Sequence, residues 1–411
     1  MGWRFVGGFD SFPMKRQRAY RLVIVLPYLK ARGTEKQALM LARGLTALGW
    51  DISLVVVMGY GESWLYEAFE KSGVKVINLG PPWYRKRKGV SWLRLPYLVR
   101  YLMFLQPDVV MSRALLANRL VGFASMIARV PFLATYSGGI AEPEDTAVPR
   151  SSLSSWFGRV HEVIWRIWQG WPAKLVTVSG KSADHLYRRY PCSLRWVMPI
   201  PNGVVCLPLQ DVSLQEKRAM DLNCVRIIFV GSIELDRKGL DVLIDAIEIL
   251  SNESMPLFRL AIVGDGPDIS PLRDLVSSKG LGSIVEFLGE SNSPLDIMRK
   301  SDLLVLPSRR EGLPNVMLEA MSCGVCVIAS SCPVGPSEVI VHRENGWLVP
   351  VGDALALAKG MRILISSPVL RAQLAQAGFA YVSTQCSAEV MTQRYDSVLR
   401  SLIGSAGFVA K

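Results

Sequence analysis

The sequence has no uncharged apolar run near the roughly 18 residues that suggest a membrane-spanning helix. Residues 1–20 mix glycine, aromatic and basic residues without the apolar centre of a signal peptide. We therefore expect a basic tail there and a chain that is not exported. Gly-x-Ser-x-Gly is absent, and His161-Glu162 has no second histidine four residues after the first. These absences argue against serine hydrolases and zinc peptidases.

Cysteine is scarce and carries no clear site. The chain has seven cysteines, an odd number in a long sequence without an export signal, so reduced thiols are expected. Cys323 and Cys326 form one Cys-x-x-Cys, but no second pair has zinc-site spacing. Packing in the core is therefore expected over a metal or redox role.

Acidic residues are under-represented in the first half. Residues 1–205 carry 28 Lys and Arg against 12 Asp and Glu, which gives a net charge of +16. Residues 206–411 have a net charge of −4, and the whole chain has +12. The basic character thus belongs to the first half, and it predicts an anionic partner there.

Strands and helices alternate in both halves, which predicts parallel sheets covered on both faces. Ligands of such sheets bind at the carboxyl ends of the strands, so two of them face to face would form a cleft. The linker is expected near residues 205–223. The predicted strands are 21–29, 51–59, 75–80, 107–112, 131–139, 175–180, 193–204, 225–232, 258–267, 284–289, 302–308, 325–331 and 346–350.

One stretch, EGLPNVMLEAMSCG, places two glutamates around a turn between a strand and a helix. Pro314 suits a first helical turn and Gly324 suits the position after the last turn, so the helix is expected from 314 to 323. Its N-terminus suits an anion such as a phosphate. Glu311 and Glu319 can accept hydrogen bonds from sugar hydroxyls. The alternative is a pair of solvated surface carboxylates.

This stretch, with its E-x7-E spacing, resembles the signature of retaining nucleotide-sugar glycosyltransferases of the GT-B fold, family 4. The run SSCPVGPSEVI is similar to the branch that often uses UDP-N-acetylhexosamines. The resemblance extends over nearly the whole chain. It continues in GTEKQALMLARGLTALGWDISLVV, QPDVV, PNGV, VGSIELDRKGLDVLIDA, AIVGDGP, VEFLG and PSEVIVHRENGWLVPVGD.

The resemblance implies an α/β protein with two Rossmann-like parallel-sheet domains facing across a cleft. Residues 1–205 would form the acceptor domain and residues 206–385 the nucleotide-sugar donor domain. Residues 386–411 would form a helix that crosses back to the first domain.

The resemblance also implies catalytic roles for Glu311, Lys238 and Arg237. Lys238 matches the family lysine that neutralises the donor diphosphate. Ser232 stands where the family usually has an arginine, and Arg237 is a candidate to replace it because guanidinium grips phosphate oxygens bidentately. Glu311 would lie near the donor sugar and Glu319 at the ribose hydroxyls.

Further donor contacts are implied for backbone positions. The N–H groups of Gly312 and Leu313 would lie beside sugar and phosphate, and Gly264 would border the nucleotide together with residues 287–290. Gly33 would approach the diphosphate, although the family commonly has Gly-Gly where this chain has Gly33-Thr34.

On the acceptor side, the family often has a histidine near residues 135–139. The histidines here are His161, His185 and His342, so Tyr136 or Ser137 would face the acceptor instead. The chain also lacks Asp-x-Asp, which is consistent with a site that uses no metal and no other cofactor. The reaction would pass through an oxocarbenium-like state with retention of configuration.

Segments 83–102 and 154–172 interleave aromatic and apolar residues with arginine and lysine, a composition that suits the interface of an anionic membrane. We therefore expect a cytoplasmic protein, peripheral on the inner face of the membrane, with a glycan or lipid-linked acceptor. The alternative is that these are packed amphipathic helices. Nucleic acid is not expected as a partner, because no recognised binding motif is present.

Two other functions compete with this interpretation. A dinucleotide-dependent oxidoreductase would need a third glycine at the fingerprint spacing after Gly264 and Gly266, and none is present. A non-catalytic membrane-binding protein on the same fold is the second alternative. The presence of Glu311, Glu319 and Lys238 argues against it.

Overall fold

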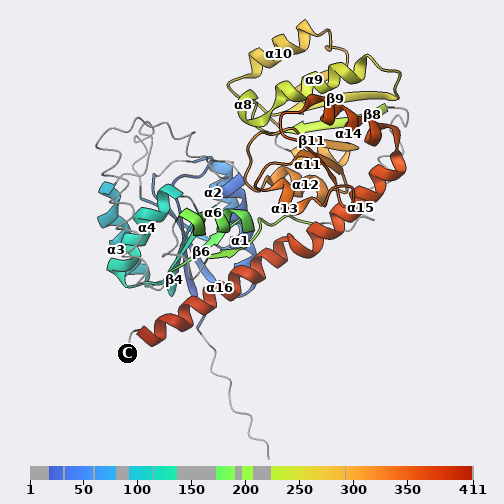
Figure 1. Ribbon diagram of the computed structural model, residues 1–411. Helices are drawn as coiled ribbons and strands as arrows, with labels where there is room; N and C mark the ends of the chain where they lie inside the picture. Colours follow the sequence, from blue (N-terminus) through green and yellow to red (C-terminus); the bar gives the residue numbers. More distant parts are fainter. Residues whose placement is uncertain are drawn as a thin grey trace, which may run out of the picture.

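A computed structural model gives the fold of the chain (Figure 1). It describes residues 18–30, 33–58, 61–79, 92–113, 115–136, 173–189, 197–206, 224–291 and 293–409. The predicted membrane segment 154–172 and the first part of segment 83–102 lie outside the described residues, as does Ser137.

The first domain is built on a seven-stranded parallel sheet with the order β3-β2-β1-β4-β5-β6-β7. Apolar, β-branched runs such as Val109–Ser112 form fully buried strands, as expected for a sheet covered on both faces. The strands are β1 Arg21–Leu26, β2 Asp51–Val56, β3 Lys75–Asn78, β4 Val109–Ser112, β5 Phe132–Tyr136, β6 Ala173–Thr177 and β7 Val197–Pro199.

Helices cover both faces of this sheet. One face packs against α1 and α2, and the other against α3, α4 and α6. These elements are α1 Gly33–Ala47, α2 Ser63–Glu70, α3 Leu95–Leu105, preceded by the 3-10 turn η1 Trp92–Arg94, α4 Leu115–Ala128 and α6 Gly180–Arg189.

The second domain has a six-stranded parallel sheet with the order β10-β9-β8-β11-β12-β13. Its strands are β8 Cys224–Val230, β9 Leu257–Val263, β10 Val285–Gly289, β11 Leu303–Leu306, β12 Cys326–Ser330 and β13 Trp347–Val349. Its helices are α8 Leu235–Lys238, α9 Leu240–Ser251, α10 Ile269–Ser278, α11 Pro294–Arg299, α12 Asn315–Ser322, α13 Pro336–Val339, α14 Ala354–Ser366 and α15 Pro368–Gln385. Two parallel sheets, each in its own domain, confirm the predicted α/β class.

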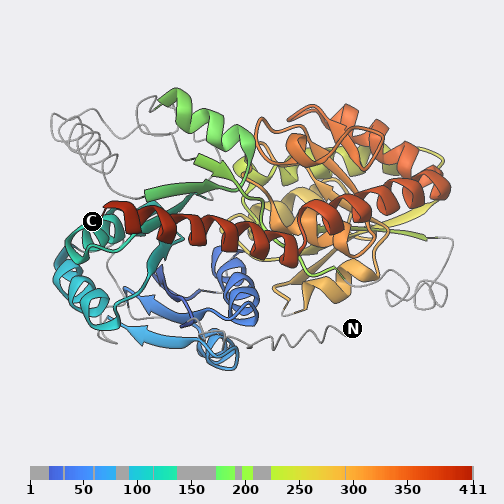
Figure 2. The same ribbon diagram turned by 90° about the horizontal axis from the view of Figure 1, so that it is seen from below.

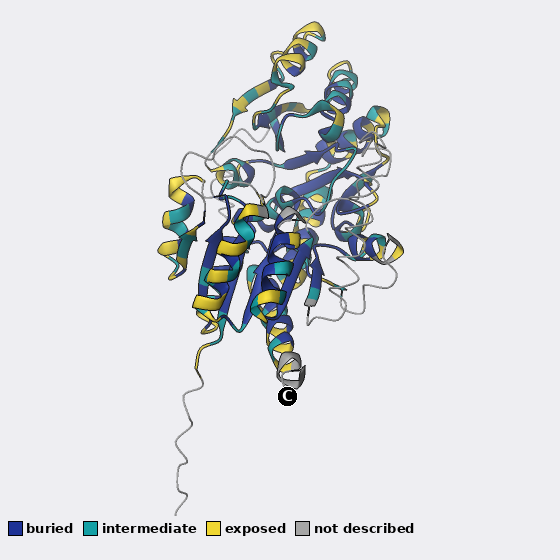
Figure 3. Cartoon of the chain, turned by 90° about the vertical axis from the view of Figure 1, so that its left-hand side faces the viewer, coloured by how far each residue is buried: buried dark blue, intermediate teal, exposed yellow. Residues whose placement is uncertain are grey.

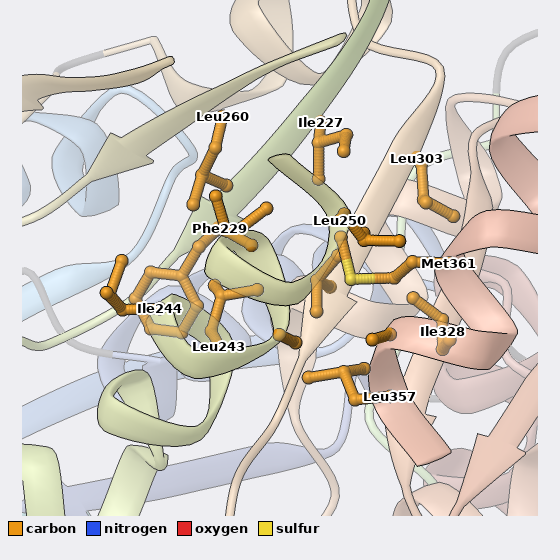
Figure 4. Close-up of a cluster of buried hydrophobic side chains, with 14 of the residues drawn as sticks. Ile227, Phe229, Leu243, Ile244, Leu250, Leu260, Leu303, Ile328, Leu357 and Met361 are labelled. Carbon is orange, nitrogen blue, oxygen red and sulfur yellow. The ribbon is translucent and has the colours of Figure 1, made fainter. Parts of the chain in front are cut away.

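The second domain has a core on each face of its sheet, one with helices α11, α12 and α15 and the other with helices α9, α10 and α14 (Figure 4). Phe229 from β8 and Ile328 from β12 are fully buried there together with Leu243 and Met361 from the helices. Burying a large apolar side chain contributes about 1.5–3 kcal/mol. This packing gives the loops at the carboxyl ends of the strands a rigid base.

The last helix, α16 (Ala388–Val409), returns to the first domain (Figures 1 and 2). It packs against α1 and contributes Met391, Tyr395 and Leu399 to the core of that domain. Trp50 Nε1 also donates a 2.7 Å hydrogen bond to Asp396 on α16. The central strands such as β4 and β11 are buried, whereas the edge strands β3 and β10 and the solvent-facing sides of the outer helices are partly exposed (Figure 3).

The two domains meet around residues 202–204. The Gln37 amide on α1 exchanges two hydrogen bonds with Gly203, at 2.7 and 2.9 Å. Val204 pairs with Ser387, just before α16. Asn202 then donates to Asn315 Oδ1 at 2.7 Å, so this junction is tied to the first turn of α12.

Candidate active site

The turn after β11 leads into α12, as the sequence pattern predicts. The helix begins at Asn315 instead of the predicted Pro314, because Pro314 is its N-cap with an extended backbone (φ −71°, ψ 117°). It ends at Ser322, and Gly324 follows with φ +66°. The first turn of α12 therefore lies directly after the Glu311–Leu313 segment.

Glu311 is held by groups from two loops of the second domain. Its Oε1 accepts a hydrogen bond from Lys238 Nζ at 2.5 Å and another from Ser308 Oγ at 2.7 Å. The Glu311 side chain is only 7% exposed. The carboxylate is thus fixed at the carboxyl end of β11 by a cation from α8, the short helix that follows β8.

Arg237, beside Lys238, lies farther from this carboxylate. Its Nη1 is 3.9 Å from Glu311 Oε2, and its closest acid is Glu234 at 2.8 Å. Hydrogen bonds from Arg237 and then Ser232 lower the pKa of Glu234 to about 2. Arg237 Nη2 also lies 3.0 Å from Ser232 Oγ. The guanidinium therefore reaches the position at which the resembling family carries its own arginine.

Two glycines let the loops around Lys238 and Glu311 approach one another closely. Gly264 has φ +136°, and a Cβ there would lie 1.9 Å from the Gly231 carbonyl oxygen. Gly335 has φ +87°, and its Cβ would lie 1.7 Å from the Gly312 carbonyl oxygen. Any side chain would push these backbones apart. Gly264 and Gly312 are thereby placed at the same edge of the sheet as Lys238 and Glu311.

Glu319 lies one helical turn beyond Asn315 on α12. Burial raises the pKa of its carboxyl, and the positive charge of Lys36 partly opposes this. Lys36 belongs to α1 of the first domain. The side of α12 that carries Glu319 thus faces α1 across the junction between the domains.

Gly33, at the start of α1, touches the same region. A Cβ on Gly33 would lie 2.5 Å from Asn315 Nδ2. The start of α1 is therefore packed against the N-terminus of α12. Leu313 is buried in the turn, and Tyr136 is half-buried at the end of β5.

The paired cysteines of the sequence belong to the core of the second domain. Cys323 and Cys326 are buried and lie outside any disulfide, and burial raises the pKa of Cys326 to about 12. Within the described ranges, no group of three His, Cys, Asp or Glu residues is placed to hold a metal ion. No helix in that part of the chain is both long and apolar enough to cross a bilayer.

Sequence reasoning missed three contributors to this site. Ser308 is the residue that links Glu311 to the end of β11, and Gly335 is the residue that admits the Gly312 carbonyl. Lys36 is the cation that acts on Glu319. Gly335 and Lys36 lie inside segments that the motifs cover, and Ser308 ends a predicted strand, but only the three-dimensional contacts reveal their roles.

Comparison with known proteins identifies the family of the chain. Residues 31–206 match the family described as Glycosyltransferase Family 4, and residues 224–367 match Glycosyl transferases group 1. The two matches together span most of the chain. The chain belongs to the family 4, group 1 glycosyltransferases. Its fold is GT-B, the fold of its structural neighbours.

Single related proteins match this glycosyltransferase over shorter stretches than the two family matches do. An uncharacterized glycosyltransferase of Haemophilus influenzae is 29% identical over 173 residues, which are 42% of this chain and 48% of that protein. The lipopolysaccharide core biosynthesis glycosyltransferase LpsD of Rhizobium meliloti is 33% identical over 39% of this chain and 45% of its own length. The chain spans about half the length, or less, of the first curated relatives it matches.

Among solved structures, Anabaena Alr3699/HepE in complex with UDP has a TM-score of 0.72 and 20% identity. The match covers 93% of this chain and 100% of that one. Similarity at this level establishes the two-domain fold.

Proposed function

We propose that this protein transfers a sugar from a UDP-sugar donor to a glycan or lipid-linked acceptor, with retention of anomeric configuration. The observation that carries the proposal is the arrangement of Lys238, Glu311 and Ser308 beside the N-terminus of α12. A cation, a fixed carboxylate and free helical N–H groups converge there, which suits a sugar diphosphate. The UDP-bound structural neighbour supports a uridine nucleotide.

In this mechanism, the donor diphosphate takes Lys238 away from Glu311. Negative charge grows on the leaving diphosphate as the bond to the sugar breaks, and Lys238, Arg237 and the first turn of α12 stabilise it. Ser308 keeps its hydrogen bond and holds Glu311 next to the sugar. No described residue is positioned as the family's usual histidine, so Tyr136 and Ser137 remain our proposed acceptor-side residues.

Glu319 is assigned to the ribose. An ionised carboxylate can accept hydrogen bonds from two neighbouring hydroxyls at once. The Glu319 carboxyl makes no hydrogen bond within the described residues, so its acceptor sites are available to a ligand. The branch resemblance of SSCPVGPSEVI favours a UDP-N-acetylhexosamine.

Thermal unfolding with added nucleotides tests the donor site. UDP at about 100 times its Kd should stabilise the protein by about 2.7 kcal/mol, and GDP should act less. Lys238→Ala and Glu319→Ala should reduce this stabilisation by UDP. If UDP stabilises both variants as much as the wild type, the site assignment is contradicted. Radiolabelled UDP-sugars with membrane lipid extract then test transfer. Absence of turnover with any nucleotide sugar would favour the non-catalytic alternative, and calorimetric binding of NAD would favour an oxidoreductase.

We further propose that the acceptor is reached at an anionic membrane surface through α3. The turn η1 and α3 present Leu93, Tyr97, Arg100 and Phe104 every three or four residues, and all four are exposed. Leu93 is 76% exposed and Phe104 is 77% exposed. Leu98 and Leu102, on the opposite side of the helix, are buried in the core. The helix is therefore apolar on its outer side as well as its inner side.

The stretch of sequence that contains α3 is strongly basic. Between residues 71 and 141 the sequence has eleven Lys and Arg and a single acid, Asp108. The helix also lies at the outer edge of the first domain, away from the second (Figure 1). Apolar side chains set among basic ones suit an interface rich in anionic lipid. Sedimentation with anionic and neutral vesicles tests this, and equal binding to both would contradict it.

A further inference from the structure

Arg113 is a buried cation that the proposed donor site does not use. It directly follows β4 and is 2% exposed. Its Nε and Nη1 atoms are buried and make no hydrogen bond. No acid forms an ion pair with it among the described residues. Its guanidinium lies 5.7 Å from the centre of the Tyr395 ring on α16.

An unpaired buried guanidinium is unfavourable for a free protein. Arginine stays charged in proteins, so it cannot relieve the desolvation by losing its proton. Burial raises the pKa of Tyr395, so the phenol stays neutral and supplies no compensating charge. A ring at this distance offers only a modest cation–π attraction. A bound anion would satisfy both the charge and the free N–H groups.

The position of Arg113 in the sheet is where such folds bind ligands. β1 and β4 are neighbours, although β2 and β3 lie on the other side of β1, so the strand order reverses between them. The Arg113 backbone N–H donates to the Val25 carbonyl on β1. Ligands of open parallel sheets bind at the carboxyl ends of the strands at this reversal. Gly33 follows β1 and Tyr136 ends β5, so Arg113 lies between the two.

We infer that Arg113 binds an oxyanion, a phosphate or a carboxylate, carried by the acceptor substrate. This inference rests on the proposed function, because it assigns the donor to the second domain and leaves the edge of the first sheet to the acceptor. Guanidinium binds both phosphate and carboxylate bidentately. The acceptor class is thus narrowed to sugars or lipids with an acidic group near the reacting hydroxyl.

The test is thermal unfolding of the full chain in phosphate-free buffer, measured without UDP and again with saturating UDP, which fills the donor site. Inorganic phosphate and malonate are the probes for the two oxyanion sources. The variants are Arg113→Met, Arg113→Lys and, as the matched control, Arg119→Met, which removes an exposed arginine of α4. Phosphate at about ten times its Kd should raise the Tm of the wild type by roughly 2 °C.

We expect Arg119→Met to keep this increase, Arg113→Lys to keep part of it and Arg113→Met to lose it. Without anion, Arg113→Met should melt above the wild type, because an apolar side chain of similar volume replaces an unpaired charge. If Arg113 has only a structural role, the Arg113→Met protein should instead have a lower Tm than the wild type and keep the phosphate-induced rise in Tm. The larger of the phosphate and malonate effects identifies the acidic group.

Two results would overturn the inference. One is a wild type that neither probe stabilises, and the other is an Arg113→Met protein that keeps the increase. Loss of the phosphate effect on addition of UDP would instead place the oxyanion in the donor site and overturn the acceptor assignment. If UDP itself fails to stabilise the chain, the proposed function fails. In that case the phosphate-induced rise in Tm is compared between Arg113→Met and Arg119→Met, each combined with Lys238→Ala. Loss of the rise only with Arg113→Met would still show that Arg113 binds an oxyanion.

Discussion

Glu311 Oε1 lies 2.5 Å from Lys238 Nζ, and this pair joins the turn after β8 to the turn after β11. The two side chains are 73 residues apart in sequence and meet at the edge of one sheet. Each neutralises the other in the free protein. A donor diphosphate can take Lys238 only by replacing Glu311 as its anionic partner, so stability and donor binding depend on the same two groups.

Lys238→Ala should therefore destabilise the free protein by about 3–5 kcal/mol, the range for breaking one partner of a buried pair. It should also lower the rate of transfer by about 100- to 1,000-fold, because a donor to the leaving group is lost. Chemical denaturation and single-turnover assays measure the two effects. The control is Lys279→Ala, which removes an equally short but more exposed ion pair with Glu248 and should cost at most about 1 kcal/mol. Equal losses for the two variants would mean that the pair at the site is an ordinary surface pair.

Much of this fold could be predicted because its determinants are local. The continuous apolar runs at 225–232 and 302–308 indicate buried parallel strands, and glycines such as Gly324 end the helices. Motif position assigned Lys238 and Glu311 to the same donor site, but it did not predict the ion pair between them. Ser308, Gly335 and Arg113 were not predicted, since their roles depend on which loops touch after folding. A serine at a strand end or an arginine after a strand has no distinctive spacing.

Titration of Glu319 should make the free energy of unfolding fall with rising pH and the affinity for UDP increase with rising pH. Burial raises the pKa of this carboxyl above its ordinary value of 4.5. The native state therefore holds the proton more tightly than the unfolded state. The resulting stabilisation is complete below the ordinary pKa and is lost as the pH rises through the raised one. UDP binding needs the ionised form, so affinity should increase across the same window.

Denaturation and calorimetry between about pH 4 and 7, around the reference range of carboxyl groups, check these signs. Glu319→Gln should lose both pH effects. Lys36→Met removes the charge that opposes the shift and should move the window to higher pH. Lys71→Met, a change of an exposed lysine elsewhere in the first domain, should leave it in place. A UDP affinity that falls with rising pH in the wild type would contradict the ribose assignment.

Gly335→Ala should damage the donor site through the backbone alone. The new Cβ would lie 1.7 Å from the Gly312 carbonyl oxygen, so the turn at Gly312 must move. Gly352→Ala is the matched control, because Gly352 also has a positive φ (+77°) but has open space around the added carbon. Both changes carry the strain of a left-handed alanine, about 1–2 kcal/mol. Only Gly335→Ala should also weaken UDP binding, as measured by calorimetry, and similar affinities for both variants would show that the Gly312 turn does not contact the donor.

The outer face of α3 can be tested by placing one negative charge on it. Phe104→Glu replaces an exposed ring by a carboxylate that anionic lipid repels, so binding to vesicles of phosphatidylserine should fall by about tenfold or more. Val369→Glu on α15 is the control, since Val369 is 67% exposed and belongs to the second domain. Circular dichroism checks that both variants fold. Because the proposed UDP site lies in the second domain, away from α3, both variants should keep the UDP-dependent rise in Tm. If Phe104→Glu and Val369→Glu reduce vesicle binding equally, the attraction is a property of the net charge of the chain, and α3 is not the membrane-binding face.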